Sequence, residues 1–257
     1  MTNGSTVILS LLFTAFAAAS MTGQVKTPAK PEKPAPFKNS AQAVVVITEN
    51  DEATGGTATL FSRSGQKGKW KADGDAFPVV IGRSGLAWDA KQATENTTAA
   101  KKEGDGNSPA GIFPLTFAFG SAAKPEGTDL SFTEVGATTE CVDDVDSTHY
   151  NKIVDRMRVG IFDWKSSEKM LEIGEEYALG VFVGYNSFPV EKGSGSCIFL
   201  HVWKDAETPT SGCTAMSRDN MERVMAWLDP EKHPYLVQMT AADHKKLAKK
   251  WNLPQTR

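Results

Sequence analysis

The feature that most constrains this chain is a series of short apolar runs separated by glycine-rich turns. Residues 43–48 are rich in valine, and residues 57–62 follow a loop containing Gly55 and Gly56, a pattern typical of a β-hairpin. Further short runs of this kind lie at residues 70–81, 86–88, 109–115, 157–164, 176–185 and 197–203. About nine short strands accompanied by few helices predict a mainly β domain.

Two helices are expected near the end of the chain. The first follows Ser217, a good N-cap residue, and ends before Pro230. Its apolar residues recur at helical spacing and predict one buried stripe, made of Met221, Val224, Met225 and Leu228. The second covers about residues 240–252, with Thr240 as its cap. With 257 residues in the chain, residues 43–257 are expected to form one domain.

The N-terminal segment has the pattern of an export signal followed by a spacer. Residues 7–19 are apolar but fall short of the roughly 20 residues that a membrane span needs. Small residues follow, so residues 1–20 are interpreted as a signal peptide, although no Lys or Arg precedes the run and an uncleaved anchor stays open. Residues 21–42 are rich in proline and lysine, as in an extended linker. We expect an exported protein without a membrane span after signal cleavage.

Charge and ligand patterns exclude several classes of function. The formal net charge of −3 offers no basic footprint for nucleic acid. The chain lacks C-x-x-C and H-E-x-x-H motifs. Cys197 and His201, four residues apart, would lie about 13 Å apart on a strand, too far to share one metal ion. We therefore expect no metal and no organic cofactor.

A histidine-bearing run and a glycine–cysteine loop form the most informative stretch. Apolar residues alternate along 197–203, which predicts a half-buried strand carrying His201. A polar loop then leads to Gly212 and Cys213, where backbone amides can approach a substrate carbonyl. These are the parts of a thiolate nucleophile, its base and an oxyanion site. The alternative is that the cysteine and histidine are ordinary buried residues.

The same residues resemble the signature of the L,D-transpeptidase (YkuD-like) catalytic domain, a family that remodels bacterial peptidoglycan. His201 followed by Thr210-Ser211-Gly212-Cys213 matches the family's histidine and Ser/Thr-His-Gly-Cys motif, and residues 105–113 are similar to its T-P-x-G-x-F segment. The resemblance covers about residues 79–228. Ser211 and Thr214-Ala215 depart from the family pattern, in which Arg or Asn follows the motif. The chain therefore resembles a divergent branch.

The resemblance implies a β-sandwich-like catalytic fold and a thioester mechanism. His201 would take the proton of Cys213, whose sulfur attacks the carbonyl after an L-centre of a peptidoglycan stem tetrapeptide. A backbone carbonyl would orient His201, and the backbone amides of Cys213 and its neighbours, including Gly212, would hold the oxyanion. The resemblance also implies a bacterial protein of the periplasm or cell envelope. Terminal D-alanine would leave, and an amine of a second stem peptide would resolve the thioester. The candidate substrate contacts are Thr210, Ser211, Asp144, Tyr150 and Trp203.

Three further expectations depend on this assignment. With Cys213 as the nucleophile, Cys141 and Cys197 remain to form a disulfide. The helix that starts after Ser217 would lower the pKa of the Cys213 thiol through its N-terminal field. Ala215 stands where the family has a substrate-holding Arg, a role that Arg83 or Arg218 would have to supply.

Other functions remain open from the sequence. If water resolves the thioester, the enzyme is an L,D-carboxypeptidase with the same site. A non-catalytic wall-binding module would keep affinity for stem peptides but have no activated thiol. An exported cysteine peptidase acting on proteins is the third alternative.

Overall fold

The computed structural model describes residues 1, 39–65, 67–93 and 99–256. The chain divides into two units, Met1–Lys33 and Pro34–Arg257, and every described residue except Met1 belongs to the second. Apart from Met1, the expected signal peptide lies outside the described residues, as does most of the expected linker. Gln42, the last residue assigned to that linker, already begins the first strand. Within the described ranges, no helix is long and apolar enough to cross a membrane.

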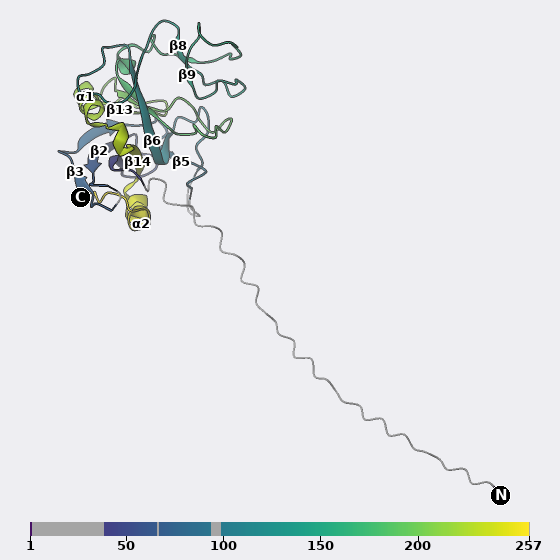
Figure 1. The fold of residues 1–257 in the computed structure, drawn as a ribbon, viewed down its shortest axis with the longest axis vertical. Coiled ribbons are helices and arrows are strands. Elements are labelled where there is room, and N and C mark those ends of the chain that lie inside the picture. The colour runs from purple at the N-terminus through teal and green to yellow at the C-terminus, as the bar shows by residue number, and fades with distance from the viewer. Residues whose placement is uncertain (2–38, 66, 94–98, 257) are drawn as a thin grey trace. The chain divides into compact units, whose positions relative to one another are not determined.

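Short strands make up most of the described chain, and helices are few (Figure 1). The first seven strands are β1 (Gln42–Thr48), β2 (Gly55–Ser62), β3 (Lys71–Ala72), β4 (Phe77–Val80), β5 (Leu86–Trp88), β6 (Ser108–Gly120) and β7 (Phe132–Glu134). The next seven are β8 (Thr139–Cys141), β9 (Ile153–Asp155), β10 (Glu168–Lys169), β11 (Gly180–Val183), β12 (Phe199–Val202), β13 (Thr214–Met216) and β14 (Tyr235–Thr240). The helices are α1 (Arg218–Trp227) and α2 (Ala241–Trp251), with 3-10 turns η1 (Gly174–Tyr177) and η2 (Pro230–Lys232).

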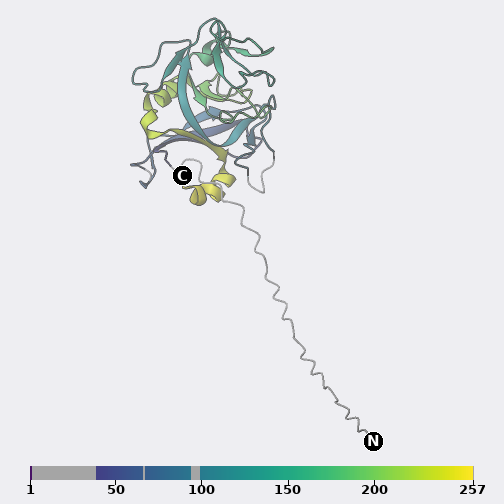
Figure 2. The same ribbon diagram turned by 45° about the vertical axis from the view of Figure 1, so that its right-hand side comes forward.

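The main sheet closes on itself. Its strands follow the order β1, β14, β6, β11, β12, β13, β4 and β2, and β2 pairs back with β1 in the expected hairpin. β1 and β14 are parallel neighbours although they come from opposite ends of the domain. Figure 2 shows the strands wrapping around a common interior. The prediction of a mainly β fold with few flanking helices is confirmed.

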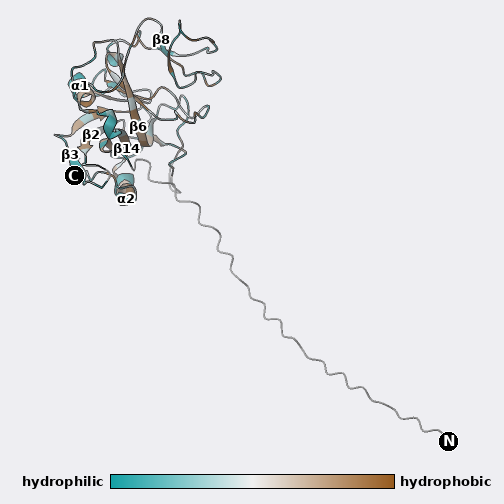
Figure 3. Cartoon of the chain, in the orientation of Figure 1, coloured by the Kyte–Doolittle hydropathy of each residue, from teal (hydrophilic) through white to brown (hydrophobic). Residues whose placement is uncertain are grey.

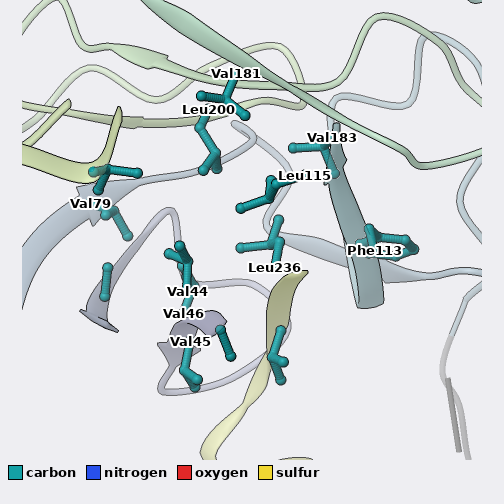
Figure 4. Packing of buried hydrophobic residues seen from close by; sticks show 14 of the residues in the cluster. Val44, Val45, Val46, Val79, Phe113, Leu115, Val181, Val183, Leu200 and Leu236 are labelled. Atoms are coloured by element: carbon teal, nitrogen blue, oxygen red, sulfur yellow. The ribbon is translucent and has the colours of Figure 1, made fainter. Parts of the chain in front are cut away.

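The interior of this ring is filled by aliphatic side chains from almost every strand. Figure 4 shows Leu115, Val183, Leu200 and Leu236, from β6, β11, β12 and β14, pointing into one shared space. All four are buried. β6 contributes most of its length to this packing, and Figure 3 shows it largely in the hydrophobic colour. Burial of such side chains stabilises the fold by about 1.5–3 kcal/mol each.

Both helices begin at the predicted caps. The Ser217 hydroxyl accepts from the backbone N–H of Asn220 at 3.3 Å, and Thr240 accepts from Asp243 N–H at 3.1 Å. The predicted stripe of the first helix is buried, with all of Met221, Val224, Met225 and Leu228 inside. Since α1 follows β13 within one residue, its cap also fixes the end of the strand after Cys213.

A second, smaller sheet lies next to a segment that was wrongly predicted to be a strand. This sheet has the order β10, β8, β9, and β8 and β9 appear above the main ring in Figure 1. Residues 157–164 were expected to form a strand, but they form a turn and an irregular segment after β9. Met157, Ile161 and Phe162 are exposed there, so the apolar pattern does not reflect a buried face.

Candidate active site

His201 and Cys213 come from adjoining strands. His201 lies on β12, and Cys213 directly precedes β13, which runs parallel to β12. In the register of this pair, Leu200 lies opposite Thr214 and His201 lies opposite Ala215. Because the strands are hydrogen-bonded neighbours, the sheet holds His201 within one strand and Cys213 at the start of the next.

β12 is buried on both faces, which corrects the expectation of a half-buried strand. Leu200 and Val202 face the main core, as the alternation of the sequence predicts. The opposite face is covered by a second apolar cluster, in which Phe199 packs with Cys213 and Tyr177. The alternation therefore separates two interiors instead of an interior from solvent.

Burial and a backbone carbonyl determine the state of His201. Its Nδ1 lies 2.7 Å from the carbonyl of Val202, the last residue of β12, so Nδ1–H donates and Nε2 is left as the proton acceptor. The side chain is only 7% exposed. Burial lowers the His201 pKa to about 4, although the carbonyls of Val202 and Glu176 act in the opposite direction. The ring is therefore neutral at neutral pH.

The Cys213 thiol is neutral as well. Its Sγ accepts from the Phe199 backbone N–H at 3.3 Å and lies 3.4 Å from the Cys197 carbonyl. Burial, assisted by the negative charge of Glu168, raises the thiol pKa far above its ordinary value. Any modest lowering of this pKa by the field of α1 is outweighed by burial, since desolvation of a thiolate costs more than a helix terminus returns.

Hydrogen bonds order the loop before Cys213. The Thr210 hydroxyl donates to the Cys213 carbonyl at 2.7 Å and accepts from the Gly212 N–H at 3.1 Å. Ser108 donates to the same carbonyl at 2.8 Å. Gly212 has φ +150, and a Cβ there would lie 3.1 Å from the Asn107 carbonyl oxygen, so glycine suits this turn.

The backbone amides of Gly212 and Cys213, both expected at the oxyanion site, differ in their hydrogen bonds. The Gly212 amide is occupied by Thr210, so it is not free to bind an oxyanion in this arrangement. The amide of Cys213 itself has no acceptor among the hydrogen bonds of the described chain. Of the two amides, only that of Cys213 is therefore without a hydrogen bond in the described chain.

A cavity of about 690 Å³ opens over these residues. Cys213 and His201 both line it, and so do the predicted substrate contacts Thr210, Ser211 and Trp203. Its volume is that of a small-molecule or peptide site. The structure thus brings the predicted nucleophile, the predicted base and three predicted contacts to one place.

Two predicted contacts do not line this cavity. The carboxylate of Asp144 accepts from the amides of Asp146 and Lys165, which places it in a turn of the chain. Tyr150 is buried, donates to Glu103 Oε2 at 2.5 Å and accepts from the Gly195 N–H. In this structure Tyr150 supports the cavity wall from behind, because Glu103 itself lines the cavity.

Sequence reasoning missed Tyr177 and Glu168. Tyr177, at the end of η1, packs edge-on against the His201 ring with centroids 5.3 Å apart, and its hydroxyl lies near enough to stabilise a thiolate on Cys213. The same hydroxyl donates to Glu168 Oε2 at 2.6 Å. Both residues line the cavity. No motif marks them, since their proximity to the cysteine arises only from the fold.

The expected disulfide is present. Cys141 at the end of β8 is bonded to Cys197, and Cys213 is the free cysteine of the three. The bond joins the small sheet to the entry of β12, two residues before the strand that carries His201. It therefore helps to place the cavity wall on which Cys197 itself lies.

Of the two arginines considered as replacements for the family's Arg, only Arg83 reaches the cavity. Ala215 lines it without any polar group. Arg218 is held by Glu175 at 2.5 Å and by Glu222 at 3.5 Å, and it does not line the cavity. The Arg83 guanidinium has no ion pair in the described part of the chain, so it is available to a ligand.

No grouping of metal ligands accompanies this chemistry. Across residues 39–65, 67–93 and 99–256, no set of three or more His, Cys, Asp or Glu side chains is placed to hold a metal ion. The side chains at the cavity include a thiol, an imidazole and carboxyl groups, which are the types that nucleophilic and acid–base catalysis use.

Fold and site together define a class of protein, namely a mainly β domain with cysteine and histidine on adjoining strands of one cavity. The family model of the L,D-transpeptidase catalytic domain (YkuD) matches residues 57–239, and the chain belongs to this family. The resemblance inferred from the sequence motifs is thereby confirmed. A search of curated proteins finds no match, and a search of solved structures finds none either.

Proposed function

We propose that the protein is an exported L,D-transpeptidase that acts on peptidoglycan stem tetrapeptides through a thioester on Cys213. Membership of the family already gives the chain an L,D-transpeptidase-type role in peptidoglycan. The observation that carries the finer proposal is the placement of Cys213 and His201 on adjoining parallel strands around one cavity. Export is supported by the apolar pattern of residues 1–20 and by the disulfide.

The proposed acylation avoids a free thiolate. The thiol proton passes to His201 Nε2 while Cys213 Sγ bonds to the carbonyl carbon after the L-centre. Negative charge then collects on the carbonyl oxygen, where the Cys213 amide can donate to it. The terminal D-alanine leaves as an amine and takes the proton from His201. Because both groups are neutral at rest, substrate binding has to precede proton transfer.

The donor peptide would be held by the walls of the same cavity. Arg83 is the proposed partner of the terminal carboxylate, the contact that Ala215 cannot make. Thr210, Ser211 and Trp203 are the proposed contacts along the peptide. An amine of a second stem peptide is the proposed acceptor, and water as the acceptor would give a carboxypeptidase instead.

The test compares the full chain with its Cys213→Ala variant on tetrapeptide muropeptides, with mass spectrometry of the products. We expect the native chain to release D-alanine and form crosslinked dimers, and the variant to do neither. Release without dimers would identify the carboxypeptidase. If both chains leave the muropeptides unchanged, the transpeptidase proposal fails; peptide binding without turnover would then support the wall-binding module, and cleavage of proteins the peptidase.

A further inference from the structure

Glu168 is a cavity carboxylate that the proposed acylation does not use. It lies on β10, where pairing with β8 sets it opposite Cys141. The Tyr177 hydroxyl donates to its Oε2 at 2.6 Å, and the same hydroxyl lies beside the Cys213 thiol. Tyr177 also packs against His201. Tyr177 is therefore the side chain that connects Glu168 to both Cys213 and His201.

One oxygen of this carboxylate is open to a ligand. Tyr177 occupies Oε2, whereas Oε1 of Glu168 has no hydrogen-bond partner in the described part of the chain. Oε1 is also not one of the fully buried polar side-chain atoms that lack a hydrogen bond in that part of the chain. Glu168 lines the cavity. A carboxylate fixed through one oxygen and open at the other suits an ammonium group, which offers several N–H donors.

The surroundings of Glu168 favour reversible protonation near neutral pH. Burial raises its pKa to about 7, the charges of Asp143 and Glu103 act in the same direction, and the hydrogen bond from Tyr177 lowers the pKa. An acid–base group is most effective when its pKa lies near the working pH. The other charged or titratable side chains around the cavity are Glu172, Glu176, His201, Cys213, Arg83, Lys101 and Lys204.

Resolution of the thioester needs a base for the acceptor. A primary amine of ordinary basicity is protonated at neutral pH, with a pKa of about 10, and cannot attack until it loses a proton. We propose that Glu168 binds the acceptor ammonium through Oε1 and removes its proton before the amine attacks the Cys213 thioester. This inference rests on the proposed function and assigns the acceptor side of the same site.

The proposed step is balanced in atoms and electrons. The Glu168 carboxylate takes one proton and becomes a carboxylic acid, and the amine nitrogen bonds to the thioester carbonyl carbon. The carbon–sulfur bond breaks with its electron pair on sulfur. The second nitrogen proton passes through His201 to Cys213, which returns to the thiol, and Glu168 releases its proton to solvent. No group is oxidised or reduced.

The test uses Glu168→Gln in the full chain, with Glu172→Gln as a matched control that removes another cavity carboxylate. Tetrapeptide donor and amine-bearing acceptor are supplied together, and mass spectrometry follows the acyl-enzyme, released D-alanine and crosslinked dimers. We expect Glu168→Gln to acylate at least as fast as the native chain, because the variant removes a charge that raises the Cys213 pKa. We expect it to accumulate acyl-enzyme and to form dimers at least about tenfold more slowly. Raising the pH toward 9 should restore part of this rate, because more acceptor is then a free amine. Thermal unfolding confirms that both variants are folded.

The pH dependence provides a readout that a structural role would not change. Dimer formation by the native chain should fall as the pH drops through about 7, because Glu168 becomes protonated. Asp143→Asn removes a charge that raises the Glu168 pKa, so this limb should move to lower pH. Glu168→Gln should lack the limb.

Several results would overturn the assignment. Native dimer formation with an unchanged pH limb in Glu168→Gln would reject Glu168 as the base while leaving the proposed function intact. Equal loss of acylation and dimer formation in that variant would also reject it. The assignment would likewise fail if the native chain formed the acyl-enzyme but released the peptide by hydrolysis alone. If the native chain forms no acyl-enzyme at all, the proposed function itself fails, and the Glu168 assignment fails with it.

Discussion

Burial drives both reactive side chains of the site toward their neutral forms. For Cys213 it raises the pKa, and for His201 it lowers the pKa, so an ion pair between them is disfavoured before substrate arrives. Such a site protects the thiol from reagents that require a thiolate. Under the proposed mechanism, the free energy for proton transfer would come from substrate binding and from charge formation on the substrate carbonyl.

The low pKa of His201 has a measurable effect on stability. Between pH 6.5 and about 4 the unfolded chain binds a proton at this residue while the folded chain does not, so acidification through this range lowers the free energy of unfolding. At pH 4.5 we expect this contribution to amount to roughly 2–3 kcal/mol relative to pH 7. Urea unfolding of the native chain and His201→Gln at both pH values measures it.

A control separates this effect from general acid sensitivity. His233→Asn changes an exposed histidine at a left-handed position that asparagine tolerates. The acid-induced loss of stability should be smaller in His201→Gln and unchanged in His233→Asn. An equal loss in all three chains would contradict the assignment to His201.

At the residue scale, the sequence predicted those cavity residues that belong to a local motif. Cys213 and His201 were predicted because they belong to a compact pattern of strand, loop and glycine. Tyr177 and Glu168 were not predicted, since no spacing in the sequence shows that a 3-10 turn and a two-residue strand meet at the thiol. Asp144 was proposed as a contact, whereas the structure places its neighbour Asp143 at the cavity.

At the scale of elements, local signals predicted where helices and the hairpin form, whereas apolar patterns alone did not reliably predict buried strands. Both helix starts follow from cap residues, which act locally. The β1–β2 hairpin is present as predicted, although Gly55 and Gly56 lie at the start of β2 and not in the turn. The strand expected at residues 157–164 is wrong, because apolar residues become a strand only where a partner edge is present. Pairing partners lie far away in this chain and leave no local mark.

The cap of α1 allows a direct test at this scale. Ser217→Ala removes the acceptor for the Asn220 N–H, and we expect it to lower the free energy of unfolding by about 1 kcal/mol. Ser131→Ala, at an exposed position outside the helices, is the matched control and should change stability by less than about 0.5 kcal/mol. Denaturant titrations of both variants measure the free energy of unfolding. An equal change in the two variants would show that the cap is not what stabilises α1.

At the scale of the whole molecule, the closed sheet and the disulfide connect distant parts of the chain. Cys141 and Cys197 are 56 residues apart, and their bond links the small sheet to the strand that carries His201. The sequence predicted this pair only through the assignment of the third cysteine as nucleophile. The closure of the ring was not predicted, because alternation along a strand does not specify its neighbours.

Removal of the disulfide should be costly. In the chain-entropy view, a bridge across this separation stabilises the folded state by about 4 kcal/mol. We expect the double variant Cys141→Ala, Cys197→Ala to unfold at lower denaturant concentration and to lose turnover, because its cavity wall is less well held. Circular dichroism in urea and muropeptide assays measure the two effects. Native stability and turnover in the double variant would show that the small sheet is held by packing alone.

The position of β14 has a consequence for the order of assembly. This strand fills the place between β1 and β6, although it is made almost last along the chain. During synthesis the β1–β2 hairpin can form early, but the ring cannot close until β14, which ends at Thr240, is available to pair. A chain shortened before β14 would leave the facing edges of β1 and β6 open, and open strand edges promote aggregation.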